Sequence, residues 1–392
     1  MTDQEPVIVG AIRTPVGKRG GRLQKWHPVD LLGETLHQLV ERSGADPKDL
    51  DDVIVGCVLQ WDEQHGNLGR HAVLAAGLPE SVPAVTIDRQ CGSGQQAVSF
   101  AAHGIKAGAY KLVIAGGVES MSRAPMPPSF RPGVPLGPQY SPRELSRYQD
   151  NPLLPQGASS ELMNARFGLT REALDAFSVR SHQRAHEATQ AGRFQDQMVR
   201  LTEDPTDPSS PVVESDEGVR ADPNPEKMAT LKAIFAADGV TTAANSSQIS
   251  DGAAALLIAS RAYADKHGLK PRARFVSTAV AAADPVIQFT AVLNATQKAL
   301  NEAGLSVSDI DLFEVNEAFA GVPLMFQQEF GVPDERLNVN GGSVAIGHPL
   351  GSTGGRMLTD LLCELERRGA RYGLQTICEA SGTANTTIIE RL

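Results

Sequence analysis

Cys91 is the residue in this 392-residue chain whose type and setting point most directly to chemistry. The apolar run 82–87 before it is typical of a strand, and the small, Ala-rich run through residue 102 after it is typical of a helix. A cysteine where a helix begins lies among free backbone N–H groups at the positive end of the helix dipole, which favours the thiolate. The pattern predicts an activated nucleophile, with a buried structural cysteine as the alternative that this residue alone does not exclude.

Three further polar side chains follow apolar runs in the second half of the chain. His348 comes after a glycine-rich turn and is a candidate general base or oxyanion donor. Asn316 follows one buried-strand pattern and Cys378 ends another. A lone histidine is more often structural, and an asparagine at a helix start is ordinary capping. Because ligands of α/β sheets bind at strand ends, we expect these side chains to meet Cys91 at one crevice.

Two thiols and one imidazole in a crevice favour covalent acyl transfer, in which Cys91 carries the acyl group while Cys378 moves a proton. A redox pair is the competing interpretation, but the chain has no C-x-x-C spacing. The few scattered cysteines lack metal-type spacing, so we expect no metal site, and free thiols in a reducing cytoplasm. They are Cys57, Cys91, Cys363 and Cys378.

Composition and charge exclude several classes of protein. Hydrophobic residues make up 41% and charged residues 21%, as in globular proteins, and 392 residues suffice for two or three domains. A net charge of −10 argues against non-specific nucleic-acid binding, so an anionic ligand would need local basic groups. No apolar run has transmembrane length. The strand-like run 7–9 lies close to Met1, so we expect no targeting segment and a cytoplasmic protein.

The chain contains an internal duplication. The matching segments are 50–56 with 307–316, the segment around Cys91 with 337–342, and 111–117 with 372–378. The order is kept and the separation stays at roughly 260 residues, which predicts two copies of one alternating β/α unit. Chance similarity between α/β segments explains this agreement less well.

The segment between the copies is of another kind. Residues 126–155 and 201–225 are proline-rich and disfavour regular structure, whereas 169–192 favours a helix capped by Thr170. Loops this long in a compact protein are usually functional or disordered, and this one contains its own helix, so we predict an inserted loop domain at 121–242 that covers the site. The predicted halves are then 1–120 with 243–272, and 273–392.

At this point four motifs make the chain resemble the thiolases, the acetyl-CoA C-acyltransferases. They are the Cys91 segment, 115–122 (AGGVESMS), 316–320 (NEAFA) and 340–349 (NGGSVAIGHP), in the order of the family. The resemblance begins at residue 8 and covers nearly the whole chain. It implies an α/β fold of two βαβαβαββ halves that form a five-layer αβαβα core, with an inserted loop domain over the active site.

The resemblance also implies a division of labour. Cys91 takes the acyl group from a 3-ketoacyl-CoA or acyl-CoA as a thioester, and His348 accepts its proton. His348 and a water held by Asn316 bind the thioester oxygen as it becomes enolate-like. Cys378 deprotonates CoA in thiolysis or the α-carbon of acetyl-CoA in condensation. The backbone N–H groups of Cys91 and Ala380 form a second oxyanion hole.

Coenzyme A and acyl-CoA are therefore the expected substrates, with no permanently bound cofactor. The resemblance implies that Arg220 lies near the adenine end of CoA, Phe235 along its arm and Ser247 at the pantetheine, with Ala318 and Phe319 near the inner end. A surface or packing role is the alternative for Arg220 and Phe235. Because family members are dimers or tetramers, we expect a homodimer or homotetramer, without nucleic-acid or membrane-spanning partners.

One departure from the family pattern affects the second oxyanion hole. The family continues after its second cysteine as Cys-x-Gly-Gly-Gly, whereas this chain has Glu379, Ala380 and Ser381 before Gly382. Alanine offers the same N–H only if the turn avoids positive φ at that position, which glycine tolerates and alanine does not readily adopt. We expect activity to survive this change.

A second departure concerns the acyl pocket. Gln156 and Gln288 stand where short-chain biosynthetic members carry two methionines that narrow the pocket. We therefore expect acyl chains longer or bulkier than acetoacetyl, cleaved mainly in thiolytic degradation to acetyl-CoA or propionyl-CoA and a shortened acyl-CoA. A biosynthetic thiolase that forms acetoacetyl-CoA is the alternative.

Other classes of protein fit less well. A ketoacyl-synthase-like condensing enzyme has no second catalytic cysteine, so Cys378 argues against it. A thiolase-like CoA- or lipid-binding protein without turnover generally loses the nucleophile or the histidine, and this chain keeps Cys91 and His348. No motif supports a redox or scaffold protein.

Overall fold

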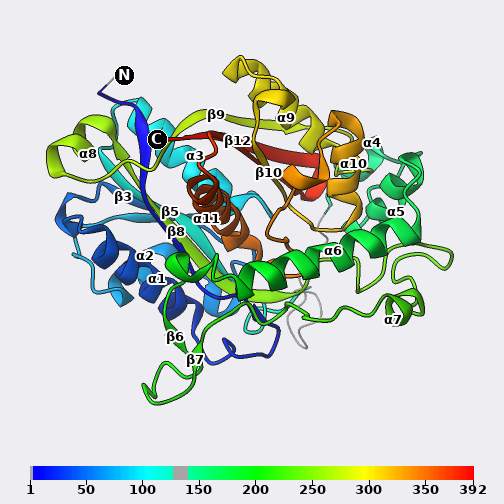
Figure 1. Ribbon diagram of the computed structural model, residues 1–392, viewed down its shortest axis with the longest axis horizontal. Helices are drawn as coiled ribbons and strands as arrows, with labels where there is room; N and C mark the ends of the chain where they lie inside the picture. Colours follow the sequence, from blue (N-terminus) through cyan, green and yellow to red (C-terminus); the bar gives the residue numbers. More distant parts are fainter. Residues whose placement is uncertain (1–2, 127–139) are drawn as a thin grey trace.

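The computed structural model describes residues 3–126 and 140–392. The first half of the chain alternates strands and helices, leaves the sheet after β5 and returns to it at β8 (Figure 1). Its elements are β1 (Pro6–Arg13), β2 (Gly17–Lys18), α1 (Pro28–Ser43), β3 (Asp52–Gly56), α2 (Leu68–Ala75), β4 (Ala84–Ile87), α3 (Ser93–Lys106), β5 (Leu112–Ser120), β8 (Ser250–Ser260) and α8 (Arg261–His267).

The second half repeats this order. Its elements are β9 (Ala273–Ala282), α9 (Ala291–Ala303), β10 (Leu312–Val315), α10 (Gly321–Phe330), α11 (Leu350–Arg368), β11 (Tyr372–Glu379) and β12 (Thr383–Arg391). The counterpart of β4 is not a strand, because only an isolated bridge joins Leu337 to Phe313. Asn338 replaces the missing ladder: its side chain accepts from the backbone N–H of Val315 at 2.8 Å and donates to the carbonyl of Val315 at 2.9 Å.

The strands of both halves form one sheet. Within the described residues its order is β10-β11-β12-β9-β1-β8-β5-β3-β4, with β2 paired to β8. The two halves join through a short antiparallel contact between β1 and β9. Helices α1 and α2 pack on the strands of the first half and α9 and α10 on those of the second, while α3 and α11 pack together in the middle (Figure 1). The strands of the two halves count as two β layers, with α3 and α11 between them, so this is the predicted five-layer αβαβα arrangement.

Glycines let the two central helices approach each other closely at their first turns. A Cβ atom on Gly94 of α3 would lie 2.5 Å from the carbonyl oxygen of Gly351, and one on Gly354 of α11 would lie 2.1 Å from the backbone nitrogen of Gln95. Only glycine permits backbone contacts this close. The residues that directly precede the two helices are thereby brought together.

The segment between β5 and β8 carries its own elements. They are α4 (Pro142–Arg147), α5 (Gln156–Arg166), α6 (Arg171–Gln190), β6 (Leu201–Thr202), β7 (Val212–Val213) and α7 (Pro225–Ala229). The helix predicted at 169–192 is confirmed as α6, and the side chain of Thr170 caps it. The prediction of no regular structure across 126–155 is wrong at α4, where the Ser141 side chain caps a helix that begins with Pro142. The same prediction for 201–225 is wrong at β6 and β7, which pair as short antiparallel strands.

Residues 127–139 of the predicted insertion lie outside the described residues, and the domain boundaries at 120, 242 and 272 stay predictions. Across 3–126 and 140–392, no helix is both long and apolar enough to cross a membrane.

Candidate active site

The four predicted catalytic side chains lie at the ends of elements from both halves. Cys91 follows β4, Asn316 follows β10, His348 precedes α11, and Cys378 is the next-to-last residue of β11. All four are buried, and even Cys91 is only 5% exposed. Cys91 packs in one apolar cluster with Ile377, the residue directly before Cys378. Leu350, two residues after His348, belongs to the same cluster, and the backbone N–H of Asn316 donates at 3.0 Å to the carbonyl of Thr376, two residues before Cys378. The structure thus brings the four side chains into one buried region, three of them at or after the ends of strands.

Hydrogen bonds fix the tautomer of His348. Its Nδ1 lies 2.7 Å from the hydroxyl of Thr353, and that hydroxyl donates its only proton to the carbonyl of Pro349 at 2.8 Å. With that proton on Pro349, Nδ1 carries a proton and donates it to Thr353, which agrees with the amide nitrogen of Asn316 facing Nε2. Nε2 is left as an acceptor, 3.4 Å from the amide nitrogen of Asn316. A neutral imidazole in this tautomer can take a proton from a thiol.

A tight turn presents Cys91 to the site. Gln90 has a left-handed φ of 48°, and the Ser93 hydroxyl accepts from the N–H of Arg89 at 2.8 Å and donates to the carbonyl of Gln90 at 2.6 Å. Helix α3 starts at Ser93 with Gly92 as its N-cap. Cys91 therefore lies one residue before the helix cap, close to where the sequence pattern puts it.

The prediction that the helix start lowers the pKa of Cys91 is wrong. Burial, reinforced by the nearby carboxyl of Glu379, raises the pKa of this thiol to about 12. Burial also raises the pKa of Cys378 well above its usual value. Burial and the positive charge of Arg356 lower the pKa of His348 to about 3. The resting site therefore holds neutral thiols beside a neutral imidazole, and Cys91 must lose its proton as it attacks.

Glu379 is a buried acid near Cys91 that the sequence analysis did not single out as functional. It is fully buried, and neither carboxyl oxygen has a hydrogen-bond partner of good geometry among the described residues. A Cβ atom on Gly92 would lie 2.0 Å from its Oε1, so the carboxyl group rests on the turn that carries Cys91. Burial raises the pKa of Glu379 to about 7, although the Thr383 hydroxyl and Arg89 partly oppose the shift.

This shift predicts a pH-dependent stability. Between pH 4.5 and 7 Glu379 is protonated in the folded protein and ionised in the unfolded chain, so its contribution is complete at low pH and is lost as pH rises through 7. The stability of Glu379→Gln relative to the wild type should therefore rise by about 2.5 kcal/mol from pH 5 to pH 8. Urea unfolding of both proteins at the two pH values measures this difference. Equal differences at pH 5 and pH 8 would contradict it.

The turn after Cys378 settles the question about Ala380. Ala380 does not have a positive φ; the left-handed residues are Ser381 at 63° and Gly382 at 75°. A left-handed conformation costs an L-residue such as serine roughly 1–2 kcal/mol. Gln288 offsets this cost, because its Oε1 accepts from the N–H of Ser381 at 3.0 Å.

The rest of the Gln288 amide is also engaged. Its Nε2 donates to the carbonyl of Leu154 and to the hydroxyl of Ser159, each at 2.8 Å. Gln288 thus ties the start of α5 to the turn that carries Ala380. These bonds favour a role in holding the turn, in addition to the predicted role of Gln288 in lining the acyl pocket. Gln156 differs, because its amide nitrogen has no hydrogen-bond partner of good geometry among the described residues, and its side chain lies near enough to Cys91 to lower the pKa of that thiol.

The predicted CoA contacts form two groups, Arg220 in one cavity and the other four residues in contact with one another in pairs. Arg220 is exposed and lines a cavity of about 440 Å³, whose other lining residues are His182, Asp222, Pro223, Asn224, Lys227, Met228, Leu231, Ala243, Ala244, Gln248 and Val344. Three residues after Ala244 in the chain, Ser247 donates its backbone N–H to the carbonyl of Ala318 at 2.9 Å. The ring of Phe235 meets that of Phe319 edge to face at 6.0 Å.

Sequence reasoning missed several members of this region. Lys227 adds a second cation to the cavity of Arg220, and His182 holds the Arg220 backbone by accepting its N–H at 3.2 Å. Neither lies in a pattern that marks it in the sequence. Ser343 donates its hydroxyl proton to Asn316, and Arg356 donates to that hydroxyl. Ser343 lies inside the quoted motif 340–349 and Arg356 lies seven residues after it, but their spacing in the sequence does not indicate contact with Asn316. Within the described residues, no group of acidic, histidine or cysteine side chains could hold a metal ion.

A duplicated α/β fold with two buried thiols, an imidazole and an amide at its strand ends defines a class of acyl-transferring protein. The thiolase N-terminal domain profile matches residues 6–262, and the thiolase C-terminal domain profile matches residues 269–391. The chain belongs to the thiolase family.

Relatives extend over the full length of the chain. A steroid 3-ketoacyl-CoA thiolase (FadA6) of Mycobacterium tuberculosis is 45% identical, with 99% of this chain and 94% of the relative covered. A 3-ketoacyl-CoA thiolase of Bacillus subtilis is 39% identical, with 99% of each covered. The crystal structure of the Bacillus anthracis acetyl-CoA acetyltransferase superposes with a TM-score of 0.88 at 36% identity, covering 99% of both chains.

Proposed function

We propose that this protein is a 3-ketoacyl-CoA thiolase, which cleaves a 3-ketoacyl-CoA with CoA into acetyl-CoA or propionyl-CoA and a shortened acyl-CoA. The observation that carries the proposal is the buried meeting of Cys91 and Cys378 beside the fixed pair His348 and Asn316. The names of the full-length relatives support the same reaction.

In the first half-reaction, the sulfur of Cys91 attacks the 3-keto carbon while its proton passes to Nε2 of His348. The backbone N–H groups of Cys91 and Ala380 stabilise the oxyanion. The C2–C3 bond then breaks and its electron pair forms the enolate of acetyl-CoA. Protonated His348 and a water on Asn316 bind that enolate oxygen, and Cys378 gives its proton to C2.

In the second half-reaction, the Cys378 thiolate takes the proton of an incoming CoA thiol. The CoA sulfur attacks the acyl thioester on Cys91, and the leaving Cys91 sulfur recovers its proton from His348. Atoms and charge balance, and both thiols end as they began. The neutral resting state of all three groups fits this cycle, since no step needs a permanent ion pair.

A thiolysis assay tests the proposed activity. The loss of the enolate absorbance of a 3-ketoacyl-CoA upon addition of CoA measures turnover. No loss with any 3-ketoacyl-CoA would favour a CoA-binding protein without turnover and overturn the proposal.

We also propose that the substrates are larger than acetoacetyl-CoA. Neither narrowing methionine is present, and a cavity of about 240 Å³ lies beside the turn at Ser381, walled by Tyr140 and Tyr148. We expect kcat/KM to be at least about 10-fold higher for medium-chain, branched or ring-bearing 3-ketoacyl-CoA substrates than for acetoacetyl-CoA, because added apolar groups gain contacts in such a pocket. Steady-state kinetics with a substrate panel measures the ratio.

The control for this prediction narrows the pocket next to Cys91. Gln156→Met should shift the preference toward acetoacetyl-CoA. Equal or better kcat/KM of the wild type for acetoacetyl-CoA would instead support a biosynthetic thiolase, the activity suggested by the name of the Bacillus anthracis structure.

Cellular setting and assembly complete the proposal. We propose a cytoplasmic location, which the four free cysteines support. We also propose that residues 121–242 cover the site.

We further propose a homodimer or homotetramer. Strand β4 supports this assembly, because it is the last strand of the sheet and its Val85 side chain is 40% exposed. Light scattering of the purified protein gives the mass that tests it.

A further inference from the structure

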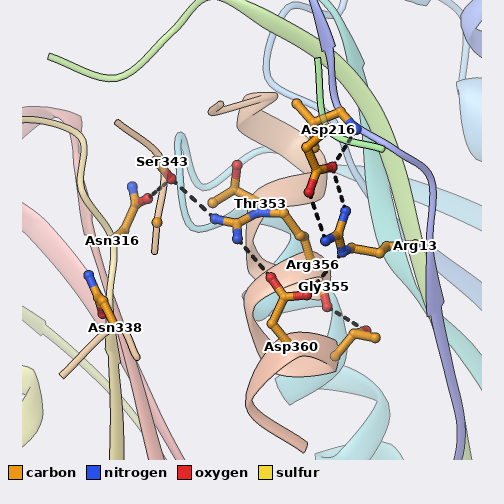
Figure 2. Close-up of polar contacts among 12 residues, drawn as sticks. Arg13, Asp216, Asn316, Asn338, Ser343, Thr353, Gly355, Arg356 and Asp360 are labelled. Carbon is orange, nitrogen blue, oxygen red and sulfur yellow. Dashed lines mark hydrogen bonds and ion pairs between the residues drawn. The ribbon is translucent and has the colours of Figure 1, made fainter. Parts of the chain in front are cut away.

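A row of buried charges runs from Asp216 and Arg13 to the side chains of Asp360 and Arg356 on α11 (Figure 2). The Asp216 carboxylate accepts from the Arg13 guanidinium at 2.7 and 3.0 Å, Arg13 Nε donates to Asp360 at 2.9 Å, and Arg356 donates to the other Asp360 oxygen at 2.9 Å. All four residues are at most 4% exposed. Buried charges persist only when they are paired and hydrogen-bonded, and here the signs alternate, so the row is neutral as a whole.

The row continues into the candidate active site. Arg356 Nη2 lies 3.2 Å from the hydroxyl of Ser343, and that hydroxyl lies 2.6 Å from Oδ1 of Asn316 (Figure 2). Asn316 is 1% exposed and contacts His348, as described above. An unbroken chain of polar contacts therefore links the ion pairs to the proposed catalytic amide.

The direction of every hydrogen bond in this chain is determined. A guanidinium can only donate, so Arg356 occupies an acceptor position on the Ser343 hydroxyl. The single proton of that hydroxyl goes to Oδ1 of Asn316, the acceptor that it meets among the described residues, so the amide oxygen faces Ser343. The amide nitrogen consequently points at Nε2 of His348, the one atom of that ring which the Thr353 bond leaves as an acceptor.

We propose that Ser343 and Arg356 are positioning residues that set the orientation of the Asn316 amide toward His348. Arg356 donates to the Ser343 hydroxyl, and that hydroxyl donates to the amide oxygen of Asn316. Asp360, which also pairs with Arg13, keeps Arg356 charged and in place. Without the hydroxyl, the Asn316 amide can rotate and present its oxygen to His348, where two acceptors would then face each other. The inference rests on the proposed thiolase activity, since Asn316 acts there by holding a water at the enolate oxygen.

The far end of the row anchors the proposed cover of the site to this chain. Asp216 also accepts the backbone N–H of Val16 at 2.9 Å, and the Arg13 guanidinium lies 4.8 Å from the ring centre of Phe194. Both Asp216 and Phe194 belong to the segment between β5 and β8. The same buried arginine therefore holds the proposed cover and the partner of Arg356.

A double-mutant cycle on the full-length enzyme tests the inference. The variants are Ser343→Ala, Asn316→Ala and the double variant, assayed by thiolysis with saturating CoA. We expect Ser343→Ala to lower kcat by about 10- to 100-fold while KM changes by less than about 3-fold. The double variant should match Asn316→Ala within about 2-fold, because Ser343 has nothing left to position.

Thr359→Val is the matched control. Thr359 is also fully buried on α11, but its hydroxyl donates only to the helix carbonyl of Gly355 at 2.8 Å. This variant should keep kcat within about 2-fold of the wild type and melt close to Ser343→Ala. Arg356→Lys, which keeps a donor-only cation, should retain more kcat than Arg356→Gln, whose amide can donate or accept.

The outcomes separate the two proposals. Losses that multiply in the double variant, or a Ser343→Ala enzyme with wild-type kcat, would overturn the positioning role while leaving the thiolase assignment intact. A wild-type enzyme without turnover on any 3-ketoacyl-CoA would overturn the proposed function, and this inference with it.

Discussion

A Cys378→Ala variant treated with acetyl-CoA is expected to accumulate an acetyl group on Cys91, whereas its thiolysis rate should fall by about 10⁴-fold or more. Acetylation needs only the sulfur of Cys91 and the base His348, and the leaving CoA can recover the proton from the imidazole. The later steps need a group that moves a proton at C2 or at the CoA thiol. In the proposed cycle that group is Cys378, which is fully buried next to Cys91.

Intact-mass analysis followed by peptide mapping measures the adduct and its position. Cys91→Ala should show neither adduct nor turnover. Cys363→Ala is the matched control, because this cysteine lies on α11 and contacts Arg272 at 3.4 Å instead of the site, so both adduct formation and turnover should persist. An acetyl group on another residue, or normal turnover of Cys378→Ala, would contradict the division of labour between the two thiols.

Replacing His348 is expected to lower kcat/KM by about 10³-fold, with the same order of loss in His348→Ala and His348→Asn. Asparagine keeps a hydrogen-bond donor near the enolate oxygen but cannot take the proton of Cys91. The pKa of that thiol is raised to about 12 and a base is needed during attack, so restoring a donor alone should recover little activity.

The pH profile gives an independent test of the same group. Because burial lowers the pKa of His348 to about 3, the imidazole stays neutral throughout pH 5–9, and no acid limb near pH 6.5 should arise from it. The profile is best measured in the Glu379→Gln variant, because the Glu379 carboxyl itself titrates near pH 7 and would obscure the result. An acid limb near pH 6.5 in the Glu379→Gln variant would contradict a neutral buried base at His348.

Local patterns in the sequence predicted the frame of the site well. Cys91, Asn316 and Cys378 each end or follow an apolar run, and such runs become strands because their alternation and length leave few other ways to bury them. The helix of the insertion was predictable from the capping residue Thr170. The same reasoning failed at Leu337, where a side chain of Asn338 replaces strand pairing, and no local pattern distinguishes these two solutions.

The hydrogen-bonding partners of the site were not predictable in this way. Gln288 and Ser381 are 93 residues apart in the chain, and Arg13 and Asp216 are 203 apart. Their pairing depends on how the two halves and the intervening segment pack. Sequence reasoning thus assigned Gln288 to the acyl pocket without its bonds to the turn, and it left Arg356 without a role.

The sequence by itself determined the duplicated α/β frame of this member of the thiolase family and the residues that we propose for acyl transfer: Cys91, His348, Cys378 and the amide of Asn316. These features are local, since residue type, spacing and strand or helix periodicity specify them. Only the tertiary structure decided how those groups are charged and oriented. Burial reverses the expected thiolate character of Cys91, and a row of distant charges fixes the direction of the Asn316 amide, because desolvation and hydrogen-bond direction depend on the groups packed around an atom in space.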